Sequence, residues 1–211
     1  MRVHERDEKV VGILLAGGLA RRMGGGDKCL RQLAGRPLLD HLIDAVTPQV
    51  DALVLNANGD AARFSNYGLP VVADSIEGYA GPLAGVLTGM EWAEKNVPGA
   101  ALVVSLATDA PFIPRNLVAR MRLAIKSESA DLACAASGGR VHPVFGLWPL
   151  CLRSDLRAAM IDEGIRKIDS WTARYNLAVV EFKYKQGRDP FFNVNKPDNL
   201  AEADRIIAEL G

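Results

Sequence analysis

Short runs of apolar residues recur along the chain, with more polar segments of helical pattern between most of them. Continuous apolar stretches of this length are typical of strands that are buried on both faces of a sheet. We expect a strand at each of the following places: residues 10–15, 52–55, 71–73, 101–106, 131–136, 144–147 and 178–182.

Between most of these runs, apolar residues recur at the spacing of one helix face. The expected helices are residues 38–46, 60–67, 83–95, 115–127, 152–163, 166–174 and 197–210. The alternation of strands and helices predicts an α/β fold, with a three-layer α/β/α arrangement and a mostly parallel sheet. Residues 137–140 have the composition of a hairpin-like turn between two short strands.

No repeat, low-complexity tract or long linker divides the sequence. We therefore expect a single domain over residues 10–211, preceded by a flexible leader at residues 1–9. In open α/β sheets the ligand binds beyond the carboxyl ends of the strands, so functional residues are expected in the loops that leave those ends.

The charge balance argues against two classes of partner. Lys plus Arg and Asp plus Glu both number 25, so the net charge is zero and no overall field attracts nucleic acid or an anionic membrane. No segment approaches the roughly 20 apolar residues of a membrane span, and residues 1–9 lack the apolar stretch of a secretory signal. The three cysteines lie far apart without a CxxC pair, which argues against disulfides or zinc and favours the reducing cytoplasm.

A loop rich in glycine and cations follows the first expected strand directly, and its sequence over residues 15–28 is LAGGLARRMGGGDK. Glycine lets backbone N–H groups approach a phosphate closely, because no Cβ intervenes and positive φ is allowed. Arg21, Arg22 and Lys28 supply charge that can neutralise a polyphosphate. The loop has neither a Walker A motif nor the dinucleotide GxGxxG spacing. Its position favours a distinct phosphate-binding loop over a mobile surface loop.

This loop resembles the fingerprint of the molybdenum cofactor guanylyltransferases, in which LAGG is followed by Arg-Met-Gly and a lysine. The resemblance implies a Rossmann-like nucleotidyltransferase fold, Mg²⁺ as cofactor, and transfer of GMP from GTP to Mo-molybdopterin with release of pyrophosphate. It implies that Lys28, Arg22 and Asp109 are catalytic. The contacts that it implies for nucleotide, metal or pterin are Leu15, Ala16, Gly17, Gly18, Arg21, Lys28, Asn56, Asp74, Gly81, Gly85, Asp109, Asn193 and Asn195.

Two polar residues follow the second and third expected strands, namely Asn56 and Asp74. A carboxylate that accepts two guanine N–H donors would distinguish guanine from adenine. The resemblance implies that both residues contact GTP and that residues 81–85 open the helix beneath it. The alternative is that Asn56 and Asp74 only cap turns, as these residue types often do.

Asp109 leaves the carboxyl end of the fourth expected strand. Mg²⁺ prefers oxygen ligands and often takes only one or two protein carboxylates together with substrate phosphates, so a lone aspartate suffices. The resemblance also makes Asp109 the metal ligand. The alternative is that Asp109 caps a helix that begins near Pro114.

Two later segments also resemble the same family, RVHPVFGLW at residues 140–148 and FFNVNKP at residues 191–197. Asn193 and Asn195 alternate along an extended segment, so both amides are expected on one face. The resemblance implies that this half binds the pterin and helps to order metal and phosphates. Arg166 is a weaker candidate for the pterin phosphate, and His142 either lines the pterin side or caps a strand.

The resemblance therefore implies a GTP-binding N-terminal half and a pterin-binding C-terminal half, and we expect a cytoplasmic monomer. The resemblance also implies transient contact with molybdoenzyme chaperones or cofactor-insertion proteins. The alternatives are a molybdopterin cytidylyltransferase, a sugar-1-phosphate nucleotidyltransferase, or a nucleotide-binding regulatory module without activity.

Overall fold

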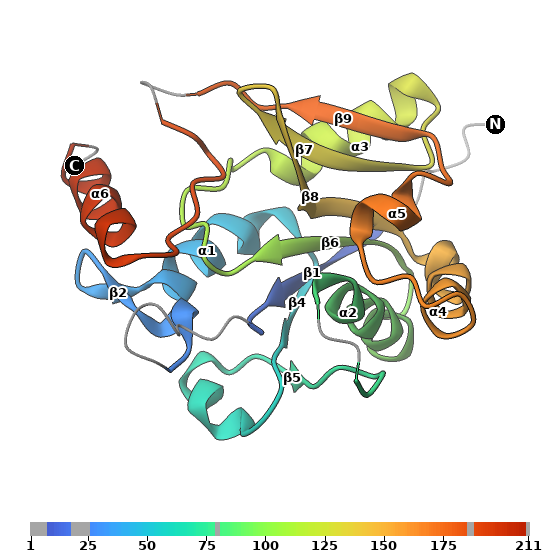
Figure 1. The fold of residues 1–211 in the computed structure, drawn as a ribbon, viewed down its shortest axis with the longest axis horizontal. Helices are drawn as coiled ribbons and strands as arrows, with labels where there is room; N and C mark the ends of the chain where they lie inside the picture. Colours follow the sequence, from blue (N-terminus) through green and yellow to red (C-terminus); the bar gives the residue numbers. More distant parts are fainter. Residues whose placement is uncertain (1–7, 18–25, 79–80, 185–187, 210–211) are drawn as a thin grey trace.

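The computed structural model describes residues 8–17, 26–78, 81–184 and 188–209, and its main feature is one seven-stranded sheet (Figure 1). The strand order is β5-β4-β1-β6-β8-β7-β9, and every strand except β8 runs in the same direction. The expected α/β fold with a mostly parallel sheet is confirmed. The strands are β1 (Lys9–Leu15), β4 (Ala52–Asn56), β5 (Val71–Val72), β6 (Ala100–Ala107), β7 (Leu132–Ser137), β8 (Arg140–Pro149) and β9 (Leu177–Glu181).

Helices cover both faces of this sheet, because successive side chains of a strand point to opposite faces. In β1, Leu14 packs with α1 (Leu38–Val46) and α3 (Leu117–Glu128), whereas Ile13 packs on the other face. That second face carries α2 (Pro82–Asn96), α4 (Arg153–Ile161) and α5 (Ile168–Thr172). The three expected layers are therefore present.

The last helix, α6 (Pro197–Ala208), lies away from the main sheet and beside a small hairpin (Figure 1). The hairpin is formed by β2 (Gln32–Leu33) and β3 (Arg36–Pro37), and Leu33 packs against Ala203 of α6. The sequence did not predict this hairpin. Its turn places Ala34 and Gly35 at positive φ, and an Ala-Gly pair is a weaker turn signal than Asn-Gly.

Two expected helices differ from the structure. Residues 60–67 form a 3₁₀ helix, η4 (Ala61–Tyr67), which is capped by the Asp60 side chain and ends at Gly68 in the left-handed conformation. The helix expected at residues 166–174 is the shorter α5. Segments this short have little helical preference of their own, so tertiary contacts decide their form.

No helix in the described residues is long and apolar enough to cross a membrane.

Candidate active site

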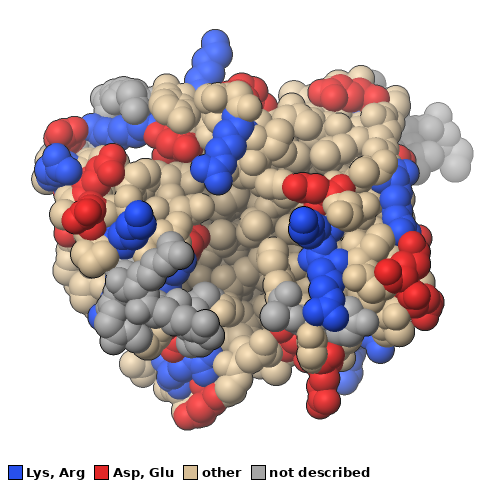
Figure 2. Space-filling view, in the orientation of Figure 1, with Lys and Arg blue, Asp and Glu red and all other residues tan. Residues whose placement is uncertain are grey.

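The cavity that gathers most of the described candidate residues lies at the carboxyl ends of β1, β4 and β6, the edge at which α/β sheets bind their ligands. Its volume is about 430 Å³, within the range of small-molecule sites. Figure 2 shows the same face of the molecule, which is hollowed near its centre and carries basic and acidic side chains around the hollow. The lining residues are Leu15, Gly17, Lys28, Asn56, Asn58, Asp74, Gly81, Pro82, Ala107, Thr108, Asp109 and Val144.

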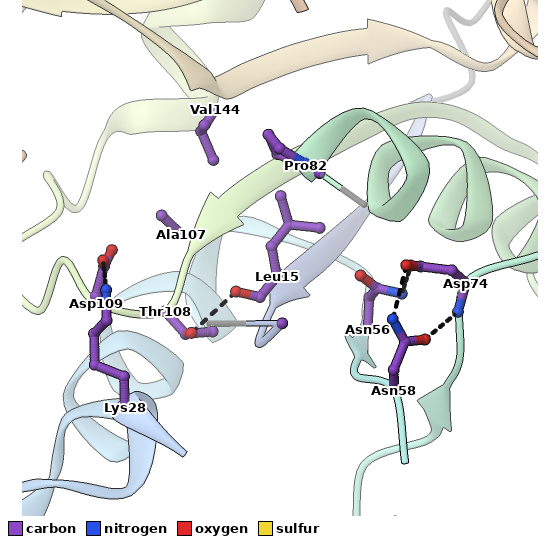
Figure 3. A pocket seen from close by; sticks show the side chains of 12 residues that line it. Leu15, Lys28, Asn56, Asn58, Asp74, Pro82, Ala107, Thr108, Asp109 and Val144 are labelled. Carbon is purple, nitrogen blue, oxygen red and sulfur yellow. Dashed lines mark hydrogen bonds and ion pairs between the residues drawn. The ribbon is translucent and has the colours of Figure 1, made fainter. Parts of the chain in front are cut away.

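One end of the cavity carries a carboxylate that is held by two amides (Figure 3). Asn56 Nδ2 donates to Asp74 Oδ1 at 2.9 Å, and Asn58 Nδ2 donates to Asp74 Oδ2 at 2.8 Å. The Asp74 backbone N–H donates back to Asn58 Oδ1 at 2.9 Å, so Asn58 and Asp74 form a two-bond fork. Each carboxylate oxygen has further acceptor capacity, so Asp74 can still meet donors of a ligand.

Asn56 rests directly on helix α2, and a glycine makes this contact possible. A Cβ at Gly85 would lie 2.4 Å from Asn56 Oδ1 and 2.5 Å from Leu15 Cδ2. Asn56 is accordingly only 5% exposed. Gly85 therefore acts by letting Asn56 and Leu15 pack against the helix backbone. Gly81 precedes the helix with φ of 143°, and Pro82 begins it.

The other end of the cavity carries a cation between two oxygen donors of distant segments. Lys28 Nζ lies 2.8 Å from Asp109 Oδ2 and also donates to Asn195 Oδ1. The backbone N–H of Val194 donates to Asp109 O at 2.8 Å, which fastens the segment that carries Asn195 to the end of β6. The Lys28 and Asp109 side chains are 17% and 18% exposed, so the pair is partly shielded from water.

The residues around Asp109 fit a hard divalent cation. A carboxylate and an amide oxygen meet there, and both are donors that Mg²⁺ prefers. The described residues contain no group of three or more His, Cys, Asp or Glu side chains that could hold a metal. A metal at Asp109 would therefore need ligand phosphates or water to complete its coordination. Asp109 does not cap α3, which begins at Leu117 after Asn116.

Two contacts join the strand ends between these two groups. Thr108 Oγ1 donates to Leu15 O at 3.0 Å, and the Ala16 backbone N–H donates to Asn56 O at 2.9 Å. Figure 3 shows Leu15 and Thr108 between the Asp74 group and the Lys28–Asp109 pair. The two ends of the cavity are thus held at a defined separation.

The far wall of the cavity arises because β6 and β8 separate. Their ladder ends at the pair Val104–Leu147. Beyond it, the Ser105 hydroxyl donates to Val144 O at 2.5 Å and accepts from Trp148 Nε1 at 2.9 Å. Along β7 the partner of Cys134 is Gly146 but that of Ala135 is His142, so residues 143–145 bulge out of the ladder. Bulges re-aim side chains next to functional sites. This bulge presents Val144 to the cavity (Figure 3).

His142 is a packed interior residue and does not line the cavity. It is 8% exposed, its Nε2 lies 2.7 Å from Ser137 Oγ, and its ring stacks on Phe191. Ser137 Oγ in turn donates to Asp189 Oδ1 at 2.7 Å. Burial lowers the pKa of His142. His142 thus helps to join β7, β8 and the segment before Asn193, and the expectation that it lines the pterin side or caps a strand stays a prediction.

The remaining C-terminal candidates are only partly brought to the cavity. Asn195 contacts Lys28, whereas Asn193 Oδ1 is buried and has no hydrogen-bond partner in the part of the chain that the structure describes. Neither residue lines the cavity itself. The backbone oxygen of Arg166 lies 3.9 Å from the Cβ position at Gly81, so its segment reaches the rim. Gly18, Arg21 and Arg22 lie outside the described residues.

Thiol chemistry plays no part in this geometry. All three cysteines are free, and burial raises the pKa of Cys29 to about 12 and that of Cys134 to about 11. Thiols with such pKa values are protonated and inert near neutral pH.

Several lining residues were not assigned a role from the sequence: Asn58, Pro82, Ala107, Thr108 and Val144. Asn58 had a usable signal, because it stands two positions after Asn56 and Asp74 follows the next strand. Val144 had none, since its place depends on the bulge in β8.

Comparison with known proteins gives a consistent result. Residues 12–176 match the family model described as a MobA-like NTP transferase domain. A molybdenum cofactor guanylyltransferase of Bradyrhizobium sp. (strain ORS 278) is 57% identical over 199 residues, which are 94% of this chain and 93% of that protein. One from Rhodopseudomonas palustris (strain BisB5) is 54% identical over 194 residues, which are 92% of each chain.

Solved structures with a similar fold are also found. The crystal structure of molybdopterin-guanine dinucleotide biosynthesis protein A from Archaeoglobus fulgidus matches with a TM-score of 0.71 and 22% identity. The match covers 94% of this chain and 99% of that one.

Proposed function

Since the chain belongs to the MobA-like NTP transferase family, we propose that it transfers GMP from GTP to the phosphate of Mo-molybdopterin and releases pyrophosphate. The observation that carries this proposal is the division of one cavity into two chemically different ends. An amide-held carboxylate, Asp74, lies at one end, and the Lys28–Asp109 pair lies at the other.

The Asp74 end suits a guanine base. Guanine presents two adjacent N–H donors on one edge, and the two oxygens of a carboxylate can accept both. Adenine lacks this pair of donors, so the acceptor positions of Asp74 that face the base would stay unmet. The amides of Asn56 and Asn58 hold Asp74 in place before a ligand arrives.

The Lys28 end suits the phosphates. The ammonium group of Lys28 would stabilise the charge on the triphosphate and on departing pyrophosphate. Glycines of the loop that begins at Gly17 would allow the backbone to approach the same groups. Arg21 and Arg22 complete the proposed set of cations.

In the proposed reaction a phosphate oxygen of molybdopterin forms a bond to the α-phosphorus of GTP, while the bond from that phosphorus to the β-phosphate oxygen breaks. The attacking phosphate is already ionised near neutral pH, so no residue has to remove a proton. The obstacle is repulsion between two anions, and the protein acts by positioning and charge neutralisation.

The proposed cofactor is Mg²⁺, held by Asp109 and substrate phosphates, with Asn195 close by. When bound, it would neutralise phosphate charge and polarise the phosphoryl oxygens. Because Lys28 contacts Asp109 in the structure, Lys28 would move from the carboxylate to the phosphates when the metal binds.

The pterin is assigned to the C-terminal half, beyond the bulge of β8, within a single domain over residues 10–211. The position of Val144 on the cavity wall and the contact of Asn195 with Lys28 support this assignment. We also propose that the enzyme is a cytoplasmic monomer. The three free thiols support the reducing compartment and do not bear on the oligomeric state. Transient contact with cofactor-insertion proteins remains part of the proposal.

Nucleotide choice tests the function most directly. GTP, CTP and dTTP would compete for binding to the purified protein, and pyrophosphate release would be followed with and without molybdopterin. We expect GTP to bind best and release to require the pterin. Preference for CTP or dTTP would contradict the base assignment. GTP binding without release in the presence of Mg²⁺ and pterin would instead indicate a binding module.

A further inference from the structure

Arg63 of η4 makes three polar contacts and one ring contact although it does not line the cavity. Its Nη2 donates to Asn58 O at 2.6 Å and its Nη1 donates to Asp60 O. Its Nε lies 2.7 Å from Asp27 Oδ2 in an ion pair that lacks hydrogen-bond alignment. The guanidinium carbon is 4.7 Å from the centre of the Phe64 ring, and Phe64 is only 1% exposed. A planar guanidinium held on so many sides has a fixed orientation.

Two of the three polar partners of Arg63, Asn58 and Asp27, lie next to opposite ends of the cavity. Asn58 forms the two-bond fork with Asp74, which is the proposed base contact. Asp27 immediately precedes Lys28 and begins the 3₁₀ helix η2 (Lys28–Leu30). Arg63 therefore connects the base end with the phosphate end through one side chain.

The Arg63–Asp27 contact is not an ordinary surface ion pair. The two side chains are 26% and 14% exposed, so water screens the charges less than at a free surface. The neighbouring turn depends on the same arginine, since Gly59 has φ of 84° and lies between the two carbonyl oxygens that Arg63 binds. Without the two hydrogen bonds from Arg63, the turn that carries Asn58 would be held less firmly.

We propose that Arg63 is a positioning residue, which holds Asn58 and hence Asp74 in register with Asp27 and Lys28. This inference rests on the proposed function, because it requires a nucleotide whose base meets Asp74 and whose phosphates meet Lys28. Two hydrogen bonds to one base edge form together only if the carboxylate is correctly oriented, so a small rotation of Asp74 weakens both. Arg63 thereby contributes to the choice of base without touching it.

Comparison of GTP with inosine triphosphate tests this role. Inosine lacks the exocyclic amino group of guanine, so the ratio of the two affinities reports how well Asp74 meets that edge. We expect Arg63→Met, which removes the guanidinium but keeps a long apolar side chain, to weaken GTP binding roughly tenfold while inosine triphosphate binding changes less. Asp27→Asn should act in the same direction, because it removes the charge that Arg63 joins to the loop.

Arg36→Met is the matched control. Arg36 is also an arginine in ion pairs near η4, with its Nη2 2.9 Å from Asp44 Oδ2, but neither Arg36 nor its partners Asp40 and Asp44 line the cavity. We expect this variant to keep the wild-type ratio of affinities. Thermal unfolding of each variant would show whether it is folded. If Arg63→Met does not fold, the same affinities are measured with Arg63→Lys and Asp27→Asn.

The outcomes separate this inference from the proposed function. A ratio that falls in the Arg63 and Asp27 variants but not in the control supports the positioning role. Equal weakening of both nucleotides, or no weakening, overturns it. If the wild-type protein prefers another base, the proposed function is wrong, and the same variants test Arg63 with that nucleotide and an analogue lacking one base-edge group.

Discussion

The base end of the cavity and its far wall are built in different ways. At the base end, polar side chains that leave successive parallel strands bind one another, as Asn56, Asn58 and Asp74 do. At the far wall, the polar groups of Ser137, His142 and Asp189 hydrogen-bond to one another in the interior. Val144 is the described residue of β8 that lines the cavity.

This difference shows where the protein is organised before a ligand binds. The base end has donors and acceptors already in place, which reduces the ordering that a nucleotide must impose. The far half lines the cavity through Val144, and its C-terminal segment brings Asn195 to Lys28. Asn193 Oδ1 has no hydrogen-bond partner among the described residues. We therefore expect substitutions at the polar ends to affect nucleotide chemistry, and those in the far half to affect the scaffold.

The largest effect is expected from Asp109→Ala. Loss of the proposed metal carboxylate should lower pyrophosphate release by roughly a thousandfold or more and remove its dependence on Mg²⁺. Binding of Mn²⁺ to the protein with GTP provides a second readout. Asp44→Ala, at a carboxylate on the surface of α1, is the control. Turnover that Mg²⁺ still stimulates would refute the metal assignment.

Lys28→Ala is expected to have the next largest effect. It should slow guanylyl transfer by roughly two to three orders of magnitude, as is typical for one electrostatic stabiliser. Since Lys28 forms an ion pair with the Asp109 carboxylate in the structure, the variant should also bind Mn²⁺ more tightly in the absence of nucleotide. Equilibrium binding and turnover measure the two effects, and Lys126→Ala on α3 serves as the control. Undiminished transfer would remove Lys28 from the mechanism.

Gly85→Ala sharpens the comparison at the base end. The new Cβ would meet Asn56 Oδ1 and should displace the amide that holds Asp74, which weakens GTP binding roughly tenfold. Gly89→Ala is a matched control on the same helix, since its Cβ would meet Ile13 in the core. Calorimetry should show weaker GTP binding in the first variant and mainly lower stability in the second. Equal GTP affinities would contradict the packing role of Gly85.

The smallest effect concerns His142 in the far half. Burial lowers its pKa in the folded protein, so below the ordinary value of 6.5 the unfolded chain binds more protons than the folded one. The free energy of unfolding should therefore fall as the pH drops below 6.5, and less steeply in His142→Gln. Urea unfolding from pH 8 to pH 5 measures this, with GTP affinity at neutral pH unchanged. Parallel curves for both proteins would contradict the role of burial.

The fold could be predicted from the sequence because its signals are local. Each expected strand is present, and α1 has the expected bounds. A strand that is buried on both faces needs a continuous apolar run, such as residues 10–15, and this run is visible in the sequence. The positions of Asp74 and Asp109 followed from the same logic, because the carboxyl ends of parallel strands meet at one edge. Their roles in nucleotide and metal binding stay predictions.

Other features could not be predicted because they depend on contacts between distant segments. Lys28 and Asn195 are separated by 167 positions, and no local pattern relates them. The hairpin of β2 and β3 is stabilised by packing of Leu33 against Ala203 of α6. The place of Val144 depends on a bulge in the pairing of β7 and β8. Arg63 gives no sign in the sequence that it joins Asp27 to Asn58.

The sequence by itself determined the order of strands and helices, the glycine-rich loop and the residue types at the strand ends, because burial and backbone conformation act on neighbouring residues. Only the tertiary structure decided which side chains share the cavity and which turn inward. That choice depends on how packed layers bring remote segments within the few ångströms over which hydrogen bonds and ion pairs act.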